Sequence, residues 1–216
     1  MQWALLEALV ALILMGFGSL MLVAEHINGE LRRLAEKDGL TDIFNRRAFL
    51  TLFNKAASLA QRSRSDLPLL LVDLDHFKHI NDTWGHGRGD EALRHFVQVA
   101  RRCLRNEDLI GRMGGEEFAI FLPNARLADA HQVAERLREA VAVSPLLSSQ
   151  GRVDLTVSIG VTLGAAGESV ESILHRADRA MYLAKHRGRN RVEIEAEPQP
   201  ARAPPPHPSP ASPIRG

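Results

Sequence analysis

Three acidic side chains in this chain stand where they could together bind a metal ion. Asp73 follows the apolar residues of "LPLLLVDLD", and Glu116 and Glu117 follow the pair Gly114-Gly115 in "RMGGEEFAIFLP". Two carboxylates held close together repel, and one is forced to take a proton unless a cation removes the conflict. Mg²⁺ prefers hard oxygen ligands, often one or two carboxylates plus substrate phosphates. If the two segments are neighbours in the fold, the acids indicate a nucleoside-triphosphate site; the alternative is that each acid caps a strand in solvent.

A polar stretch rich in glycine, "FKHINDTWGHGRGD" (77–90), lies between these acids. By default Asn81 and Asp82 are typical turn or cap residues, and Asp90 is an acid of the kind that a helix N-terminus favours. The alternative is recognition of a base. A carboxylate can accept hydrogen bonds from guanine N1–H and N2–H₂, and an asparagine amide can complete the edge. Adenine lacks this donor pattern.

The elements that must position these residues alternate between helix and strand over 38–196. Helical periodicity predicts helices over 47–62, 89–105, 128–143 and 169–188, and apolar runs predict strands over 67–75, 109–123, 153–164 and 191–196. This alternation predicts an α/β (α+β) fold with a mixed sheet flanked by helices. The Gly-Gly pair within 109–123 fits a two-residue hairpin turn, where positive φ favours glycine, so Glu116 should begin the returning strand.

The N-terminal region, 1–25, predicts a membrane anchor helix. Residues 8–24 carry no charge, and as a helix they would reach ~26 Å, on the short side for a membrane span. A cleaved signal peptide would need a positive n-region, which is missing here, and a buried core helix is the other alternative. Arg32, Arg33 and Lys37 follow the span, so the following domain should lie in the cytoplasm, held by a single pass at the inner membrane.

The remaining segments complete the expected domain plan. Residues 26–37 predict a short amphipathic helical connector, and the proline-rich residues 197–216 predict a disordered tail. The net charge of +1 gives no reason to expect a nucleic-acid partner. The single cysteine, Cys103, excludes an internal disulfide framework, and its helical spacing from apolar residues predicts a place in the core.

Four segments resemble the motifs of GGDEF domains, which are diguanylate cyclases. They are "DGLTDIFNRR" (38–47), "DLDHFKHINDTWGHGRGD" (73–90), "GGEEF" (114–118) and "ADRAMYLAKHRGRN" (177–190). The resemblance covers 38–196 and implies a fold like the palm of adenylyl cyclases and some polymerases. It implies that two GTP molecules condense to cyclic di-GMP and release two pyrophosphates, with Mg²⁺, or Mn²⁺ as an alternative, as the cofactor.

The resemblance also implies roles for individual residues. Asp73, the Leu74 main-chain carbonyl and Glu116 would hold the metal, and Glu117 would face the metals or assist deprotonation. The implied substrate-binding residues are Asn81, Asp90 and His86 for guanine, and Lys78, Lys185 and Arg189 for phosphates. Because one domain offers one guanine pocket and the product has two guanines related by a two-fold axis, the active species is expected to be a homodimer.

A second site is expected at "RNED" (105–108). From the residues alone, this tetrapeptide is typical of a helix end. By resemblance it is the family's inhibitory product site, where Arg105 would bind phosphate or a guanine edge and Asp108 would accept from guanine. Either Arg136 or Arg138 would add contacts.

The opening motif departs from the family at one position, where Asp42 replaces a frequent glycine. Because this position is remote from the metal acids, little effect on the chemistry is expected.

Two other functions compete with an active cyclase. The first is a non-catalytic receptor that binds cyclic di-GMP through Arg105 and Asp108. Degenerate members of the family usually lose the signature acids, and this chain keeps both. The second is a cyclase that acts on a single triphosphate, which the pair Asn81 and Asp90 disfavours.

Overall fold

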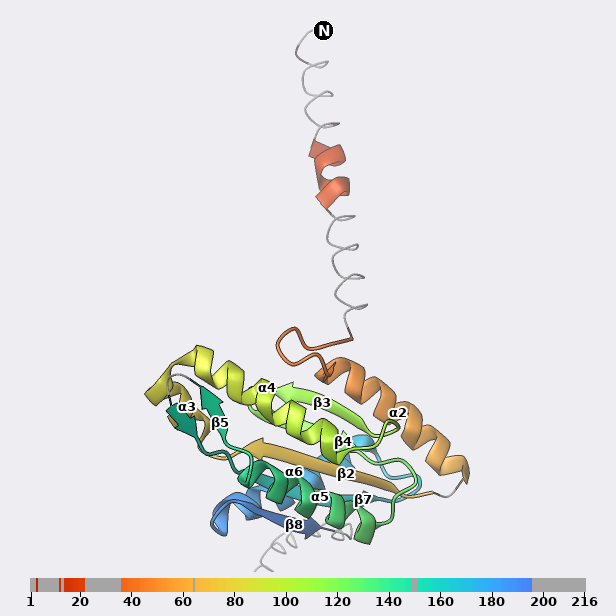
Figure 1. The fold of residues 1–216 in the computed structure, drawn as a ribbon. Helices are drawn as coiled ribbons and strands as arrows, with labels where there is room; N and C mark the ends of the chain where they lie inside the picture. Colours follow the sequence, from red (N-terminus) through yellow and green to blue (C-terminus); the bar gives the residue numbers. More distant parts are fainter. Residues whose placement is uncertain are drawn as a thin grey trace, which may run out of the picture.

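The computed structural model describes residues 3, 12, 14–21, 36–63, 65–148 and 151–195. In chain order the labelled elements are β1 (Phe44–Asn45), α2 (Arg46–Ser63), β2 (Leu67–Leu74), α3 (Phe77–Trp84), α4 (His86–Cys103), β3 (Leu109–Gly114), β4 (Glu117–Phe121), α5 (Leu127–Ala142), β5 (Leu146–Ser148), β6 (Gly151–Val153), β7 (Val157–Gly164), α6 (Val170–His186) and β8 (Arg191–Glu195). Within the described ranges, six strands form a mixed sheet in the order β1-β3-β4-β2-β7-β8, and β5 pairs with β6 beside it (Figure 1). The predicted α/β fold with a mixed sheet is confirmed.

The central strand, β2, is buried along its whole length and pairs antiparallel with both β4 and β7. Helices cover both faces of the sheet (Figure 1). A strand covered on both faces is expected to be continuously apolar. That explains why its sequence shows no alternation of apolar and polar residues.

The two faces of β2 belong to two separate hydrophobic clusters. Leu70, Val72 and Leu74 pack in the cluster that includes α3, α4 and α5. Leu69 and Leu71 pack with residues of α2 and α6. Because successive side chains on a strand point to opposite faces, Asp73 lies on the face of α2 and α6.

The turn between β3 and β4 differs from the predicted Gly-Gly turn. Gly114 still belongs to β3, Gly115 and Glu116 form the turn, and β4 begins at Glu117. The pairing of the two strands is irregular between Arg112 and Gly114, because β3 carries a bulge there. An extra residue in one strand moves the turn by one position. The prediction that Glu116 begins the returning strand is therefore wrong.

Two further elements differ from the prediction. The predicted strand 153–164 is interrupted at 154–156, and its first part joins a short hairpin, β5–β6, that the sequence did not indicate. The polar stretch 77–90 is almost entirely helical, divided into α3 and α4 by Gly85 with φ of 81°. Glycine adopts this left-handed backbone without the Cβ clash that other residues meet.

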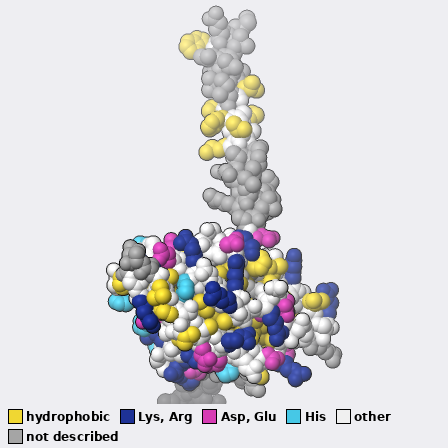
Figure 2. Space-filling view, viewed as in Figure 1, with side chains coloured by type: hydrophobic (Ala, Val, Ile, Leu, Met, Phe, Trp, Pro, Cys, Tyr) yellow, Lys and Arg dark blue, Asp and Glu magenta, His cyan; other side chains and the backbone are white. Residues whose placement is uncertain are grey.

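Most of the predicted anchor and connector, and the whole tail 197–216, lie outside the described residues. Residues 14–21 are helical, and their large apolar side chains are exposed (Figure 2). Within the ranges that the structure describes, no helix is long and apolar enough to cross a membrane. Lys37 forms an isolated bridge with Phe44, so the predicted helical connector cannot extend to Lys37.

Candidate functional site

The predicted metal acids meet at the end of β2. Asp73 pairs in register with Glu117 of the neighbouring β4, and residues directly opposite each other carry their side chains on the same face. The Leu74 amide donates a hydrogen bond to the main-chain oxygen of Glu116, with N···O of 3.3 Å. The condition set by the sequence, that the two acidic segments be neighbours, is met.

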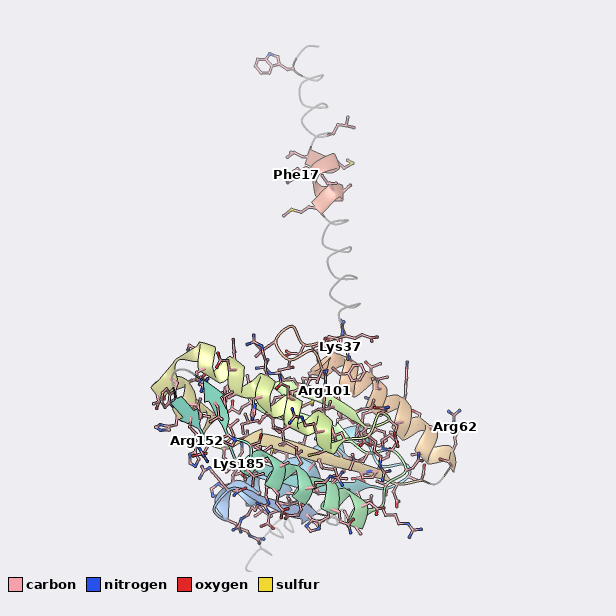
Figure 3. The ribbon with its side chains drawn as sticks, in the orientation of Figure 1. Phe17, Lys37, Arg62, Arg101, Arg152 and Lys185 are labelled. Carbon is pink, nitrogen blue, oxygen red and sulfur yellow. The ribbon has the colours of Figure 1, made fainter. Side chains whose placement is uncertain are left out.

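Asp73 is the buried acid of this group, with 5% of its surface exposed. Burial, together with the charges of Glu116 and Glu117, raises the pKa of Asp73 to about 6, against the opposing effect of a hydrogen bond and the charge of Lys185. The Lys185 ammonium, in the last turn of α6, lies 2.8 Å from Asp73 Oδ2 (Figure 3). The site therefore holds acids that would gain from a further cation.

The donor set suits a hard divalent cation, because Asp73 and Glu116 offer carboxylate oxygens and Leu74 a main-chain carbonyl. Among the described residues, no group of three or more His, Cys, Asp or Glu side chains could by itself hold a metal ion. Such a site fits a metal that takes its remaining ligands from substrate phosphates and water, as Mg²⁺ commonly does.

A second acid, Asp75, lies on the same face and has a different environment. Its carboxylate accepts hydrogen bonds from the hydroxyls of Thr156 at 2.8 Å and Ser158 at 2.7 Å, and from the Asn190 amide at 3.0 Å. With 4% of its surface exposed, Asp75 is as buried as Asp73, but its oxygens are fully engaged by protein donors. It joins β2, β7 and the loop before β8, a structural role that sequence reasoning missed. In the sequence, the spacing of the two acids in "DLD" could have indicated that Asp75 lies on the same face as Asp73.

The candidate guanine residues lie where α3 meets α4. Asn81 and Asp90 are half-buried, and His86 begins α4 and is exposed. A Cβ atom at Gly89 would collide with the Asn81 side-chain oxygen and come within 3.1 Å of Phe77. Glycine at position 89 is thus what allows the two helices, and with them Asn81 and Asp90, to approach this closely.

The candidate phosphate residues come from two elements. Lys78 is an exposed residue of α3. Lys185 lies in the last turn of α6, and Arg189 follows the helix in a left-handed conformation with φ of 60°. The Arg189 amide donates to the Ala184 carbonyl at 3.0 Å, which fixes the backbone of the exposed Arg189 side chain next to the helix end.

Arg112, which sequence reasoning missed, links the opening motif to the turn between β3 and β4. Its guanidinium donates to the Gly115 carbonyl at 2.9 and 2.7 Å and forms an ion pair with Asp38 at 3.2 Å. Asp38 also accepts from the Thr41 amide and hydroxyl. These hydrogen bonds hold the pKa of Asp38 below its usual value, although burial acts in the opposite direction. In the sequence, an arginine two residues before the Gly-Gly pair could have pointed to this link.

The RNED segment forms a closed turn between α4 and β3. The Arg105 amide donates to Asp108 Oδ2 at 2.7 Å, and the Asp108 amide donates to the Arg105 carbonyl at 3.2 Å. Burial raises the pKa of Asp108, while the Arg105 amide and the charges of Arg105 and Arg136 oppose this shift. A hollow of about 290 Å³, lined in part by Lys37, Arg101 and Arg105, adjoins the turn.

The structure separates the two arginines that the sequence left as alternatives. Arg136 reaches the end of α4, where it donates to the Cys103 carbonyl at 2.7 Å, and its charge acts on Asp108. Arg138 instead pairs with Glu135 at 2.7 Å. Of the two, Arg136 is the one beside the RNED turn. Cys103 itself is buried, as predicted.

Asp42, the residue that departs from the family pattern, has φ of 55°. This left-handed conformation explains why glycine would be favoured at the position. The Asp42 carbonyl accepts a hydrogen bond from Arg101 Nη2 at 2.8 Å. The opening loop is thereby tied to the helix that leads into the RNED turn.

Comparison with known proteins gives related sequences of known type. Response regulator PleD of Caulobacter vibrioides is 43% identical over 160 residues, which cover 73% of this chain and 35% of PleD. Diguanylate cyclase DgcM of Escherichia coli is 40% identical over 166 residues, which cover 77% of this chain and 40% of DgcM. The chain therefore spans less than half the length of either relative.

Solved structures agree with the sequence relatives. The GGDEF domain of DgcB from Caulobacter crescentus, solved in complex with c-di-GMP, matches with a TM-score of 0.71 and 37% identity, covering 74% of this chain and 93% of that chain. The family described as "Diguanylate cyclase, GGDEF domain" matches residues 35–191, and the acids, the candidate guanine residues and the RNED turn all lie within that range. This chain belongs to the GGDEF-domain family of diguanylate cyclases.

Proposed function

We propose that this protein condenses two GTP molecules into cyclic di-GMP and releases two pyrophosphates. The observation that carries the proposal is the meeting of Asp73, the Glu116 turn and Lys185 at one end of the sheet. Acids that repel one another, beside an ammonium, suit a triphosphate that brings its own metal ion. Membership of the family and the names of the related proteins support the same reaction.

Asp73, the Leu74 carbonyl and Glu116 would hold Mg²⁺, or Mn²⁺ in its place. Bound there, the metal would neutralise charge that develops on the attacking and leaving oxygens of an in-line displacement. Glu117, opposite Asp73 in register, would face the metals or help to deprotonate the attacking 3′-hydroxyl. Diguanylate cyclases of this family are metal-dependent, and the donor set described here fits that requirement.

The substrate would be held by residues on both sides of these acids. Asn81 and Asp90 would bind the guanine edge, with His86 nearby, and Lys78, Lys185 and Arg189 would contact phosphates. Holding the two reactants in position supplies most of the catalysis in phosphoryl transfer, because little covalent work is left to the protein. Each domain binds one guanine, so two domains would face each other as a two-fold homodimer.

We also propose that cyclic di-GMP inhibits its own synthesis at the RNED turn. Arg105, Asp108 and Arg136 offer two guanidinium groups and a carboxylate at one corner, and Lys and Arg side chains gather on this face of the molecule (Figure 2). The turn leads directly into β3, which carries the catalytic turn at its other end.

We propose finally that residues 1–25 hold the enzyme at the inner face of the membrane as a single-pass anchor. The uncharged sequence span and the exposed apolar side chains of residues 14–21 support this. After carbonate washing, the full chain should stay with membranes, and a chain that begins at His26 should not. A full chain found in the supernatant would end this proposal.

The catalytic proposal is tested by incubating the full chain with GTP and Mg²⁺ and separating the products by chromatography. Glu116→Gln keeps the shape of the side chain and removes a charged ligand, so the rate should fall ~10²–10³-fold. Glu139→Gln, a change to an exposed acid on α5, is the control and should leave the rate unchanged. If wild type binds cyclic di-GMP and forms none with either metal, the receptor function replaces the cyclase.

A further inference from the structure

The hairpin β5–β6 is held against the corner that carries the candidate guanine residues. Arg88, in the first turn of α4, donates from Nη2 to the Gly151 carbonyl at 2.9 Å and to the Leu146 carbonyl at 3.4 Å. These two carbonyls belong to the two strands of the hairpin. A single side chain of α4 thus fastens both strands.

Arg88 makes these contacts from a buried position. Its side chain is 2% exposed, and its only described carboxylate partner is Glu91, at 2.5 Å and 51% exposed. Within the described part of the chain, Arg88 Nε has no hydrogen-bond partner. Burying a charge with one partner contributes little to net stability, and an apolar side chain of similar size would fill the space as well. The burial is therefore better explained by what the guanidinium holds than by the stability it adds.

The hairpin also lies beside the other helix of the corner. A Cβ atom at Gly151 would lie 3.4 Å from the ring of Trp84, the last residue of α3. Trp84 follows Asn81 by three residues, and Arg88 precedes Asp90 by two. The hairpin therefore bridges α3 and α4 beside the two residues that would bind guanine.

We infer that Arg88 is a positioning residue for guanine recognition, acting through the β5–β6 hairpin, which braces α3 against α4 and sets the spacing of Asn81 and Asp90. The inference rests on the proposed function, since it assumes that the corner binds guanine. Displacement of binding groups by about an ångström can cost on the order of a hundredfold. Loss of the brace should therefore weaken nucleotide binding and leave the metal acids, on a different element, in place.

The test uses the full chain and 3′-deoxy-GTP, which lacks the attacking hydroxyl and so binds without reacting. Arg88→Met keeps the apolar stem and removes the donors; its Kd for 3′-deoxy-GTP and its KM for GTP should rise on the order of tenfold, with kcat within a few-fold of wild type. Arg88→Lys, with one ammonium able to reach a carbonyl, should recover part of the affinity. Arg152→Ala is the matched control, because Arg152 lies on the same hairpin and, among the described residues, forms its ion pair with Asp154 at an exposed site (Figure 3).

Gly151→Val supplies a second route to the same corner. It crowds Trp84 at a backbone position with φ of 130° and keeps the Arg88 charge, so it should also raise the Kd. If Arg88→Met does not fold, the Kd of Gly151→Val tests the inference in its place. An unchanged Kd in a folded variant, or an equal fall in kcat and affinity, would overturn the inference. If wild type neither binds 3′-deoxy-GTP nor forms product, the proposed function itself fails and the inference falls with it.

Discussion

At the scale of single residues, the site contains two acids whose carboxylates have different partners. Asp75 has three protein donors, so its charge is compensated without a ligand. Asp73 has Lys185 on one side and two further acids on the other. The two carboxylates are two positions apart on one strand, yet only Asp73 gains from an added cation. Their substitutions should therefore have opposite effects on the stability of the metal-free protein.

The raised pKa of Asp73 predicts a pH dependence of stability. The pKa of Asp73 is about 6 in the folded protein and 3.8 for an ordinary aspartate, as in the unfolded chain, so between these values the folded state binds more protons. Stability should then fall as pH rises from 4 to 6, by up to about 3 kcal/mol. Asp73→Asn should remove this slope. Denaturant unfolding in EDTA at several pH values measures it, and parallel curves for wild type and variant would contradict the assignment.

Asp75→Asn should instead destabilise the protein at neutral pH. The amide places a donor where Thr156 and Ser158 already donate, so buried polar groups lose partners at a cost of about 1–3 kcal/mol. Because Asp75 is not placed among the metal ligands, Mg²⁺ should not restore the loss. Denaturant midpoints with and without Mg²⁺ provide the measurement, and a neutral variant would show that these hydrogen bonds are dispensable.

The sequence indicated Asp73, Glu116 and Glu117 because acids at the ends of apolar runs are easily seen. It did not indicate Arg112 or Arg88, because an arginine on a strand or helix has the same local pattern whether it faces solvent or a partner far away in the sequence. Arg112 reaches Asp38 and Arg88 reaches Gly151, and such contacts depend on long-range packing, which only the folded chain shows.

At the scale of elements, the contact between α3 and α4 depends on Gly89. A methyl group there would meet the Asn81 oxygen, and overpacking of this kind typically costs about 1–3 kcal/mol. Gly89→Ala should therefore lower stability, and Asn81→Ala should relieve part of the clash.

The measurement is a double-mutant cycle of unfolding free energies. The double variant should be more stable than the sum of the single changes predicts, because the two side chains are in contact. Simple additivity would show that Asn81 moves away freely and that Gly89 does not position it.

Element type was predictable where periodicity was strong, as in α2, α5 and α6. The errors have local causes. The bulge in β3 moved the catalytic turn by one residue, and the hydrogen bonds of Asp75 with the main chain and side chain of Thr156 accompany the break between β6 and β7. Neither a bulge nor a distant hydrogen bond changes the hydrophobic pattern of the strand that carries it.

At the scale of the whole molecule, contacts run from the RNED turn to the β3–β4 turn by two routes. One is β3 itself. The other passes from Arg101, four residues before Arg105, to the Asp42 carbonyl, and from Asp38 through Arg112 to the Gly115 carbonyl. A ligand that moved Arg105 and α4 could therefore change the geometry of the acids, with a coupling of about 1–3 kcal/mol.

Progress curves test this feedback. Wild type should slow well before GTP is exhausted, and Arg105→Ala should continue with a nearly unchanged initial rate, because Arg105 contacts no metal acid. Arg136→Ala should behave in the same way, whereas Arg138→Ala, whose partner is Glu135, should still be inhibited. If all four curves bend alike, the RNED turn is only the end of a helix.

The three donors to Asp75 bear on the order in which the protein matures during synthesis. They come from positions 156, 158 and 190, so a nascent chain that has just exposed Glu116 and Glu117 has made none of these hydrogen bonds, and one that has exposed Ser158 can have made two. At roughly 5–20 residues per second, synthesis of the segment between these acids and position 190 takes several seconds, during which Asp75 lacks its full set of partners. The edge of the sheet that carries the candidate site is therefore expected to be among the last parts of the domain to close.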